Sequence, residues 1–137
     1  MRFLLDENVI ESVYDPLTVI FEGHEFSTVH RENWSGLLDI PLFEKMTQHG
    51  FHALITHDLA QLTNPDERNS LRNHGLHWIG VKEPRFSGVK GISLETAAVV
   101  AALPYVLDDL ATCVTPTAFH VIGLPSEHKQ RVRTEPI

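Results

Sequence analysis

A short apolar run at the start of the chain ends abruptly in polar residues. Residues 1–8 read MRFLLDEN, so the apolar side chains of residues 3–5 are followed at once by Asp6, Glu7 and Asn8. A run of this kind is typical of a buried strand, and in open α/β sheets ligands bind at the edge formed by the carboxyl ends of the strands. The sequence therefore predicts a central strand that delivers acidic groups to a binding edge.

Strand-like and helix-like segments alternate along the rest of the chain. Strand-like runs cover residues 25–29, 53–56, 78–81 and 117–122, and helical patterns cover residues 9–21, 39–46, 67–74 and 93–110. Pro16 is expected to break or kink the first helix, and Ser93 is the expected N-cap of the last one. This order predicts an α/β fold, a three-layer α/β/α sandwich with a mainly parallel sheet. We expect residues 1–125 to form one domain and residues 126–137 to form a polar tail.

The charge balance argues against a general nucleic-acid-coating protein. Eighteen acidic and eleven basic side chains give a net charge of −7, whereas coating proteins neutralise phosphates with an extended basic surface. A nuclease with an acidic centre and a local basic rim is compatible with this balance.

No apolar run approaches the roughly 18 residues of a membrane span, and the single cysteine gives no disulfide framework. We therefore expect a soluble, cytoplasmic protein with no membrane partner.

Four aspartates fall at predicted strand ends or helix starts. Asp6 and Asp58 follow strand-like runs, and Asp39 and Asp66 stand where helical patterns begin. Carboxylates are preferred ligands of Mg²⁺ and Mn²⁺, and a cation held by several of them activates water and stabilises the leaving oxygen in phosphodiester hydrolysis. Each aspartate also has a simpler interpretation as a helix cap or turn residue. The pattern makes Asp6, Asp39, Asp58 and Asp66, together with Glu7, candidate ligands of such a cation.

Polar and basic residues near these aspartates are candidates for substrate binding. Asn8 and His57 adjoin the predicted metal ligands, and Arg68 and Arg72 lie in the basic helical segment 67–74. Arginines at the rim of an acidic centre would hold RNA phosphates, although a solvated helix face is the default explanation for them. Trp34, in the loop before the second helix, is expected either to stack on an unpaired base or to anchor that loop on the core.

Other common site chemistries find little support in the sequence. No pair of the nine histidines has HxxxH spacing with a carboxylate on one helix face, and one cysteine provides no thiolate set for zinc. The chain also has neither a glycine-rich phosphate loop nor a GxSxG elbow. A zinc site, a nucleotide-binding P-loop and a serine hydrolase are therefore not predicted.

Four motifs together resemble one known family. They are MRFLLDEN at residues 1–8, GHEF at residues 23–26, the helix-opening Asp39, and LITHD at residues 54–58. They look like the small PIN-like domains related to VapC-type toxin ribonucleases, over residues 1–81. The resemblance implies a PIN-like fold, a divalent-metal-dependent endoribonuclease activity on RNA and, for many members, a partner antitoxin protein. Residue by residue, Asp6, Asp39 and Asp58 take the family's metal-binding positions.

Position 60 departs from the family pattern, because the expected further aspartate is replaced by Ala60, which Gln61 follows. Three interpretations stay open. Asp66 replaces the missing ligand from the next turn, or three aspartates and water hold the metal, or the domain is catalytically silent and binds RNA or a protein partner.

A phosphoacceptor receiver domain is an alternative from a different class, since it has acids at a similar spacing. It also needs a hydroxyl residue at the end of its fourth strand and a lysine at the end of its fifth, and the sequence places neither there. Residues 82–137 match no known pattern, and the long helix in this part is a candidate surface for a homodimer.

Overall fold

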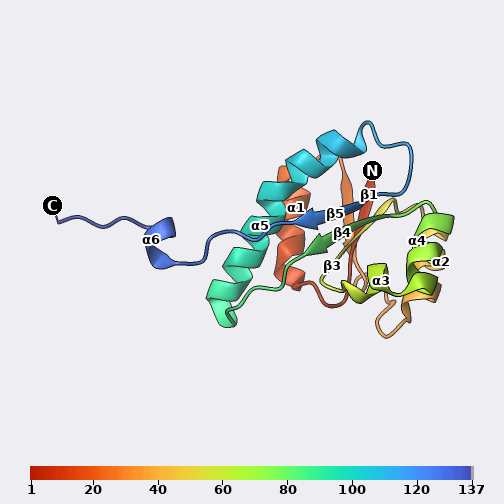
Figure 1. The fold of residues 1–137 in the computed structure, drawn as a ribbon, viewed down its shortest axis with the longest axis horizontal. Helices are drawn as coiled ribbons and strands as arrows, with labels where there is room; N and C mark the ends of the chain where they lie inside the picture. The colour runs from red at the N-terminus through yellow and green to blue at the C-terminus, as the bar shows by residue number, and fades with distance from the viewer. Residues whose placement is uncertain (137) are drawn as a thin grey trace.

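Five short apolar segments form one parallel β-sheet (Figure 1). Its order is β2-β1-β3-β4-β5, and every neighbouring pair is parallel. Leu5 pairs with both Thr28 and Ile55, so the carboxyl ends of β1, β2 and β3 are level. The predicted α/β class is confirmed. In the computed structural model, which describes residues 1–136, the strands are β1 (Arg2–Leu5), β2 (Glu25–Thr28), β3 (Ala53–Thr56), β4 (His77–Val81) and β5 (Ala118–Val121).

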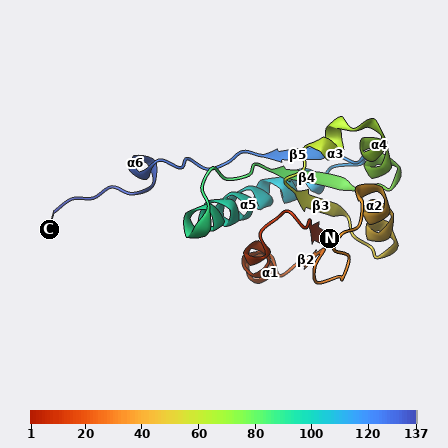
Figure 2. The same ribbon diagram turned by 90° about the horizontal axis from the view of Figure 1, so that it is seen from below.

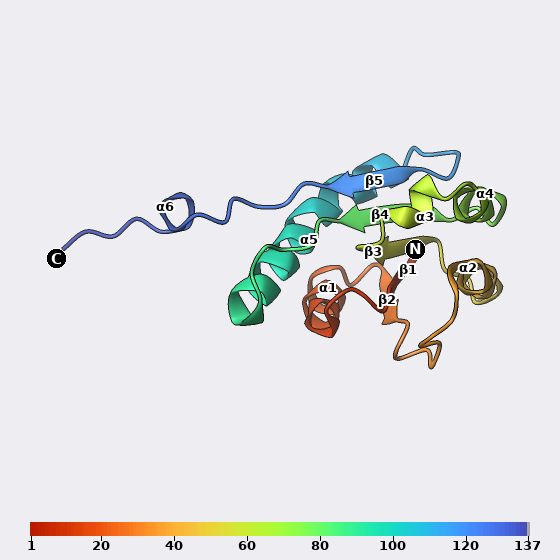
Figure 3. The same cartoon turned by 60° about the horizontal axis from the view of Figure 1, so that its bottom comes forward.

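Alternate side chains of the strands point into two separate cores. Phe3 and Leu5 pack with residues of η1, α1 and α5, whereas Leu4 and Leu54 pack with residues of α2 and α4. Figures 2 and 3 show α1 and α5 on one side of the strands and α2 on the other, which confirms the three layers. The helices are η1 (Glu11–Val13), α1 (Tyr14–Ile20), α2 (Asp39–Gln48), α3 (Ala60–Thr63), α4 (Pro65–Asn73), α5 (Gly88–Leu110) and α6 (His128–Arg131).

Two local predictions about helices are wrong. Pro16 does not break α1, because the helix begins at Tyr14 and Pro16 lies in its first turn, where a backbone N–H has no partner within the helix. Ser93 does not cap α5, which begins at Gly88, and the Ser93 hydroxyl instead donates to the carbonyl of Val89 within the helix. The core face of α5 starts with the buried Gly91, so its first turns lack an apolar signal.

Three further elements differ from expectation. The short helix α3 lies between β3 and α4, where no element was predicted, and α6 lies in the predicted polar tail, which extends from the rest of the chain in Figure 1. By length and composition α5 is apolar enough to cross a membrane, although no such run was expected from the sequence. Its buried residues pack in the core that also holds β1, β3 and β4, and core helices commonly pass the same test.

Candidate functional site

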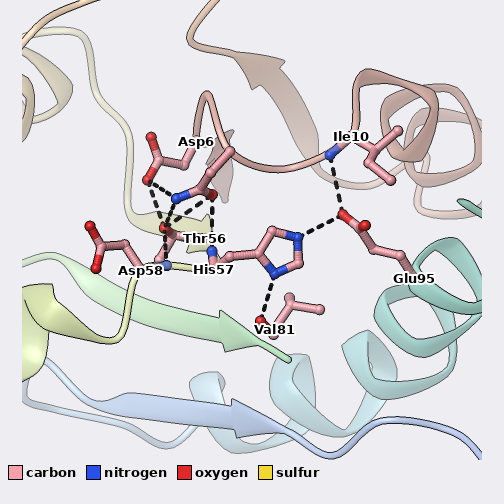
Figure 4. A network of polar contacts seen from close by, with 8 residues as sticks. Asp6, Ile10, Thr56, His57, Asp58, Val81 and Glu95 are labelled. Atoms are coloured by element: carbon pink, nitrogen blue, oxygen red, sulfur yellow. Dashed lines mark hydrogen bonds and ion pairs between the residues drawn. The ribbon is translucent and has the colours of Figure 1, made fainter. Parts of the chain in front are cut away.

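The carboxyl ends of β1 and β3 are joined by a hydrogen-bond network around Thr56 (Figure 4). The fully buried Thr56 hydroxyl donates to Oδ2 of Asp6 at 2.6 Å and accepts from the backbone N–H of Asp58 at 3.0 Å. The Asn8 side chain also links the segment after β1 to the segment after β3. Its Oδ1 accepts from the backbone N–H of His57 at 3.0 Å, and its Nδ2 donates to Asp6 at 3.3 Å. Thr56, which the sequence offered only as part of the LITHD motif, therefore holds Asp6 and the backbone of Asp58 together. Asn8 supports the same edge and is exposed, so its predicted contact with substrate stays a prediction.

A buried amide connects Asp39, the first residue of α2, to Asp6. The Gln61 side chain comes from α3 and is 1% exposed. Its Nε2 donates to Oδ1 of Asp39 at 2.5 Å and to Oδ2 of Asp6 at 3.3 Å. On the other side, the indole N–H of Trp78 donates to Oε1 of Gln61 at 3.0 Å. Because an indole is only a donor, this contact turns the amide oxygen away from the carboxylates and the NH₂ group toward them.

Three of the four predicted metal ligands lie within electrostatic reach of one another. Burial raises the pKa of Asp39, and the charges of Asp6 and Asp58 raise it further, although the hydrogen bond from Gln61 acts in the opposite direction. The site therefore concentrates negative charge at the edge where β1 and β3 end.

The fourth predicted ligand, Asp66, and its neighbour Glu67 both lie in the first turn of α4. Asp66 is exposed in the first turn of α4, where its backbone N–H donates to the capping Asn64 side chain. The pKa of Glu67 is raised by burial and then by the charges of Asp39 and Asp58. Glu67, which the sequence did not single out, therefore lies within electrostatic reach of Asp39 and Asp58, and the role of Asp66 as a ligand stays a prediction.

The donor chemistry of the acidic edge fits Mg²⁺ or Mn²⁺, because all its charged groups are carboxylates. Within residues 1–136, however, no three acidic, histidine or cysteine side chains surround one point closely enough to hold a metal ion. The Gln61 amide lies between Asp6 and Asp39, where a shared cation would be expected. The carboxylates that the sequence predicts as metal ligands therefore lie near this edge, and an amide stands between two of them.

His57 points toward α5, and its side chain is 9% exposed. It also lines a cleft together with Glu95, and its predicted contact with substrate stays a prediction. Its Nδ1 donates to the carbonyl of Val81 at 2.7 Å, and its Nε2 lies 2.9 Å from Oε1 of Glu95 (Figure 4). Glu95, which is 2% exposed on α5, also accepts from the backbone N–H of Ile10 at 3.1 Å. Burial alone would lower the pKa of His57, but the hydrogen bonds with Glu95 and Val81 and the charges of Glu95 and Glu83 outweigh it and raise the pKa. The pair ties β3 to β4 and α5.

The raised pKa of His57 makes the stability of the fold depend on pH. A histidine with a higher pKa in the folded state stabilises fully below its unfolded pKa, and this contribution is lost as the pH rises through the folded pKa. We expect the difference in unfolding free energy between the wild type and His57→Gln to be largest at acidic pH and to shrink above the ordinary pKa of 6.5. Urea unfolding of both proteins across this range measures it, and a difference that grows with pH would contradict the assignment.

Two other sequence predictions concern the surroundings of the site. Arg68 and Arg72 are exposed on α4 and line a cleft of about 390 Å³ together with Trp78 and His120. This position is compatible with phosphate binding, which stays a prediction. Trp34 is 5% exposed and packs edge-on against Phe51, with 5.7 Å between ring centroids. It anchors its loop on the core, so the alternative of base stacking is wrong.

Comparison with known proteins identifies the family of the chain. A family model described as a PIN like domain matches residues 1–83. No curated protein and no solved structure gives a significant match. The matched region contains β1 to β4, the whole Thr56 network and the Gln61 contacts. The parallel sheet with acids at its carboxyl edge and the family match agree, and the chain belongs to the PIN-like domain family.

Proposed function

We propose that this chain is a divalent-metal-dependent endoribonuclease centred on Asp6, Asp39 and Asp58. PIN-like domains form a superfamily that includes nucleases. The observation that carries the proposal is the gathering of three carboxylates from separate segments of the chain at one sheet edge, near enough that Asp6 and Asp58 raise the pKa of Asp39. Such crowding is unfavourable by itself, and a cation would relieve it. Asp6, Asp39 and Asp58 would hold Mg²⁺ or Mn²⁺, which would stabilise the negative charge that develops during phosphodiester hydrolysis.

The protein residues around this centre supply orientation and substrate contacts in the proposal. Hydrogen bonds of Thr56 and Asn8 hold Asp6 in position relative to the segment that leads to Asp58. Arg68 and Arg72 are the candidates for RNA phosphates, and they contribute local positive charge in a chain of net charge −7. A cytoplasmic toxin role, a cognate antitoxin and a homodimer extend this proposal from the resemblance to VapC-type toxins and from the exposed face of α5.

Chelation of divalent metal tests the proposal directly. We expect the purified chain to cleave end-labelled single-stranded RNA in Mg²⁺ or Mn²⁺, to lose this activity in EDTA and to recover it when Mn²⁺ is added in excess. Gel analysis of the labelled RNA measures all three states. A control preparation carrying Asp39→Asn identifies any contaminating ribonuclease, because contaminant cleavage would survive the substitution. Cleavage by the wild type that persists in EDTA would contradict the proposal.

A catalytically silent domain that binds RNA or a protein partner is the second candidate. The observations that favour it are the closed acidic pair and the alanine at position 60, whose backbone N–H donates to Oδ1 of Asp58 at 2.8 Å. RNA that is retained by the chain without being cut, in Mg²⁺ and in Mn²⁺, would favour this candidate.

A further inference from the structure

We propose that the amide of Gln61 stands in for a cation between Asp6 and Asp39, so that the centre is held closed until this amide is displaced. The inference rests on the metal site of the proposed function and concerns how that site is regulated. It makes Gln61 a positioning residue that lowers the affinity of the acidic pair for metal.

The first support is the location of the amide nitrogen. Nε2 of Gln61 lies 2.5 Å from an oxygen of Asp39 and 3.3 Å from an oxygen of Asp6. A single group within hydrogen-bond distance of both carboxylates occupies the space that a bridging cation would need. An amide NH₂ group donates hydrogen bonds and has no lone pair to offer a metal, so it satisfies the acids and excludes a ligand at once.

The second support is that the amide cannot simply turn over. Its oxygen accepts from the indole of Trp78, and both side chains are buried, at 1% and 2% exposure. The indole itself lies along β4 over Gly80, where a Cβ atom would stand 1.9 Å from the ring. With its oxygen held by Trp78, Gln61 presents only donors to Asp6 and Asp39.

The third support is that the amide of Gln61 is paired at both ends in its present position. Within residues 1–136 no buried side-chain nitrogen or oxygen lacks a hydrogen-bond partner. Asp39, Asp6 and Trp78 each use Gln61 as one of these partners. Displacing this amide would break its hydrogen bonds with Asp39, Asp6 and Trp78. Metal binding therefore competes with an existing set of hydrogen bonds.

Two substitutions test the inference by opposite routes. Gln61→Glu keeps the size and the oxygen that faces Trp78 but replaces the NH₂ group with a third carboxylate oxygen. Trp78→Phe adds no charge but removes the indole donor, which frees the amide to turn its oxygen toward a cation. Gln130→Glu is the matched control, because it adds the same charge at an exposed position of α6.

Titration with Mn²⁺ by calorimetry, together with melting temperatures in EDTA and in Mn²⁺, gives a readout that does not depend on RNA cleavage. We expect Gln61→Glu to bind Mn²⁺ at least about tenfold more tightly than the wild type and to gain a metal-dependent rise in melting temperature. Trp78→Phe is expected to bind more tightly as well, and Gln130→Glu to match the wild type.

The inference is overturned if neither Gln61→Glu nor Trp78→Phe binds Mn²⁺ more tightly than the wild type, or if Gln130→Glu gains as much. These outcomes are separate from the fate of the proposed nuclease. If the wild type cleaves no RNA but Gln61→Glu binds Mn²⁺ more tightly, the proposed nuclease function is contradicted and the inference about Gln61 is supported. If the wild type cleaves RNA but neither Gln61→Glu nor Trp78→Phe changes Mn²⁺ binding, the nuclease function is supported and the inference about Gln61 is contradicted.

Discussion

Replacing Asp6 with asparagine is expected to lower the rate of RNA cleavage by about 10²–10³-fold, as for loss of one key electrostatic group in an active site. Both carboxylate oxygens of Asp6 accept short hydrogen bonds, one from the Thr56 hydroxyl at 2.6 Å and one from the backbone N–H of Glu7 at 2.7 Å. Asparagine keeps the size but removes the charge and one acceptor. Hydrogen bonds to charged groups contribute about 1.5–3 kcal/mol each, so part of the loss will also appear as lower stability.

The measurement for Asp6→Asn is therefore made in two parts. Cleavage rates are taken at a temperature at which urea unfolding shows that both proteins are folded. Asp108→Asn is the matched control, since it removes the same charge from an exposed position of α5, and we expect it to cleave at the wild-type rate. Wild-type activity in Asp6→Asn would refute the assignment of Asp6, and a similar loss in Asp108→Asn would show that overall charge, not the site, sets the rate.

Replacing Glu95 with alanine is expected to destabilise the fold by about 3–5 kcal/mol, the usual effect of removing one partner from a buried ion pair. Glu95 is 2% exposed, and it accepts from both Nε2 of His57 and the backbone N–H of Ile10. Alanine leaves these two donors without their acceptor in the interior. The loss of stability is expected to be much smaller in Glu95→Gln, because an amide oxygen still accepts one hydrogen bond there.

Urea unfolding at neutral pH measures the effect of Glu95→Ala. Glu83→Ala is the matched control, because Glu83 is exposed and acts on His57 only through its charge. We expect its effect to stay within about 0.5 kcal/mol, as for most surface substitutions. If Glu95→Ala and Glu83→Ala destabilise the chain equally, the ion pair does not hold α5 to the sheet as described.

The strands and their acids were predictable because a buried parallel strand has a local signature. Residues 53–56 form an uninterrupted apolar and β-branched run, and β3 (Ala53–Thr56) has these bounds. Once the strands are parallel, topology alone brings Asp6 and Asp58 to the same edge. No long-range information about side chains is needed for that step.

The contacts that complete the site could not be predicted, because they depend on residues far apart in the chain. Glu95 and His57 are 38 positions apart, and Glu95 stands on a helix whose other buried residues are mostly apolar. The orientation of the Gln61 amide is set by its hydrogen bond with Trp78, which lies 17 positions away on β4. In the sequence, Gln61 was only the residue after a missing aspartate, whereas in the fold its amide contacts two of the three predicted aspartates, Asp6 and Asp39.

The neighbours His57 and Asp58 place a constraint on how this domain can evolve. His57 belongs to the contacts of α5, and Asp58 belongs to the acidic edge on the other side of the sheet. Successive residues leaving a strand point to opposite faces, so an insertion or deletion of one residue between Thr56 and Asp58 would exchange the two environments. The step from Thr56 to Asp58 therefore has a fixed length in this fold.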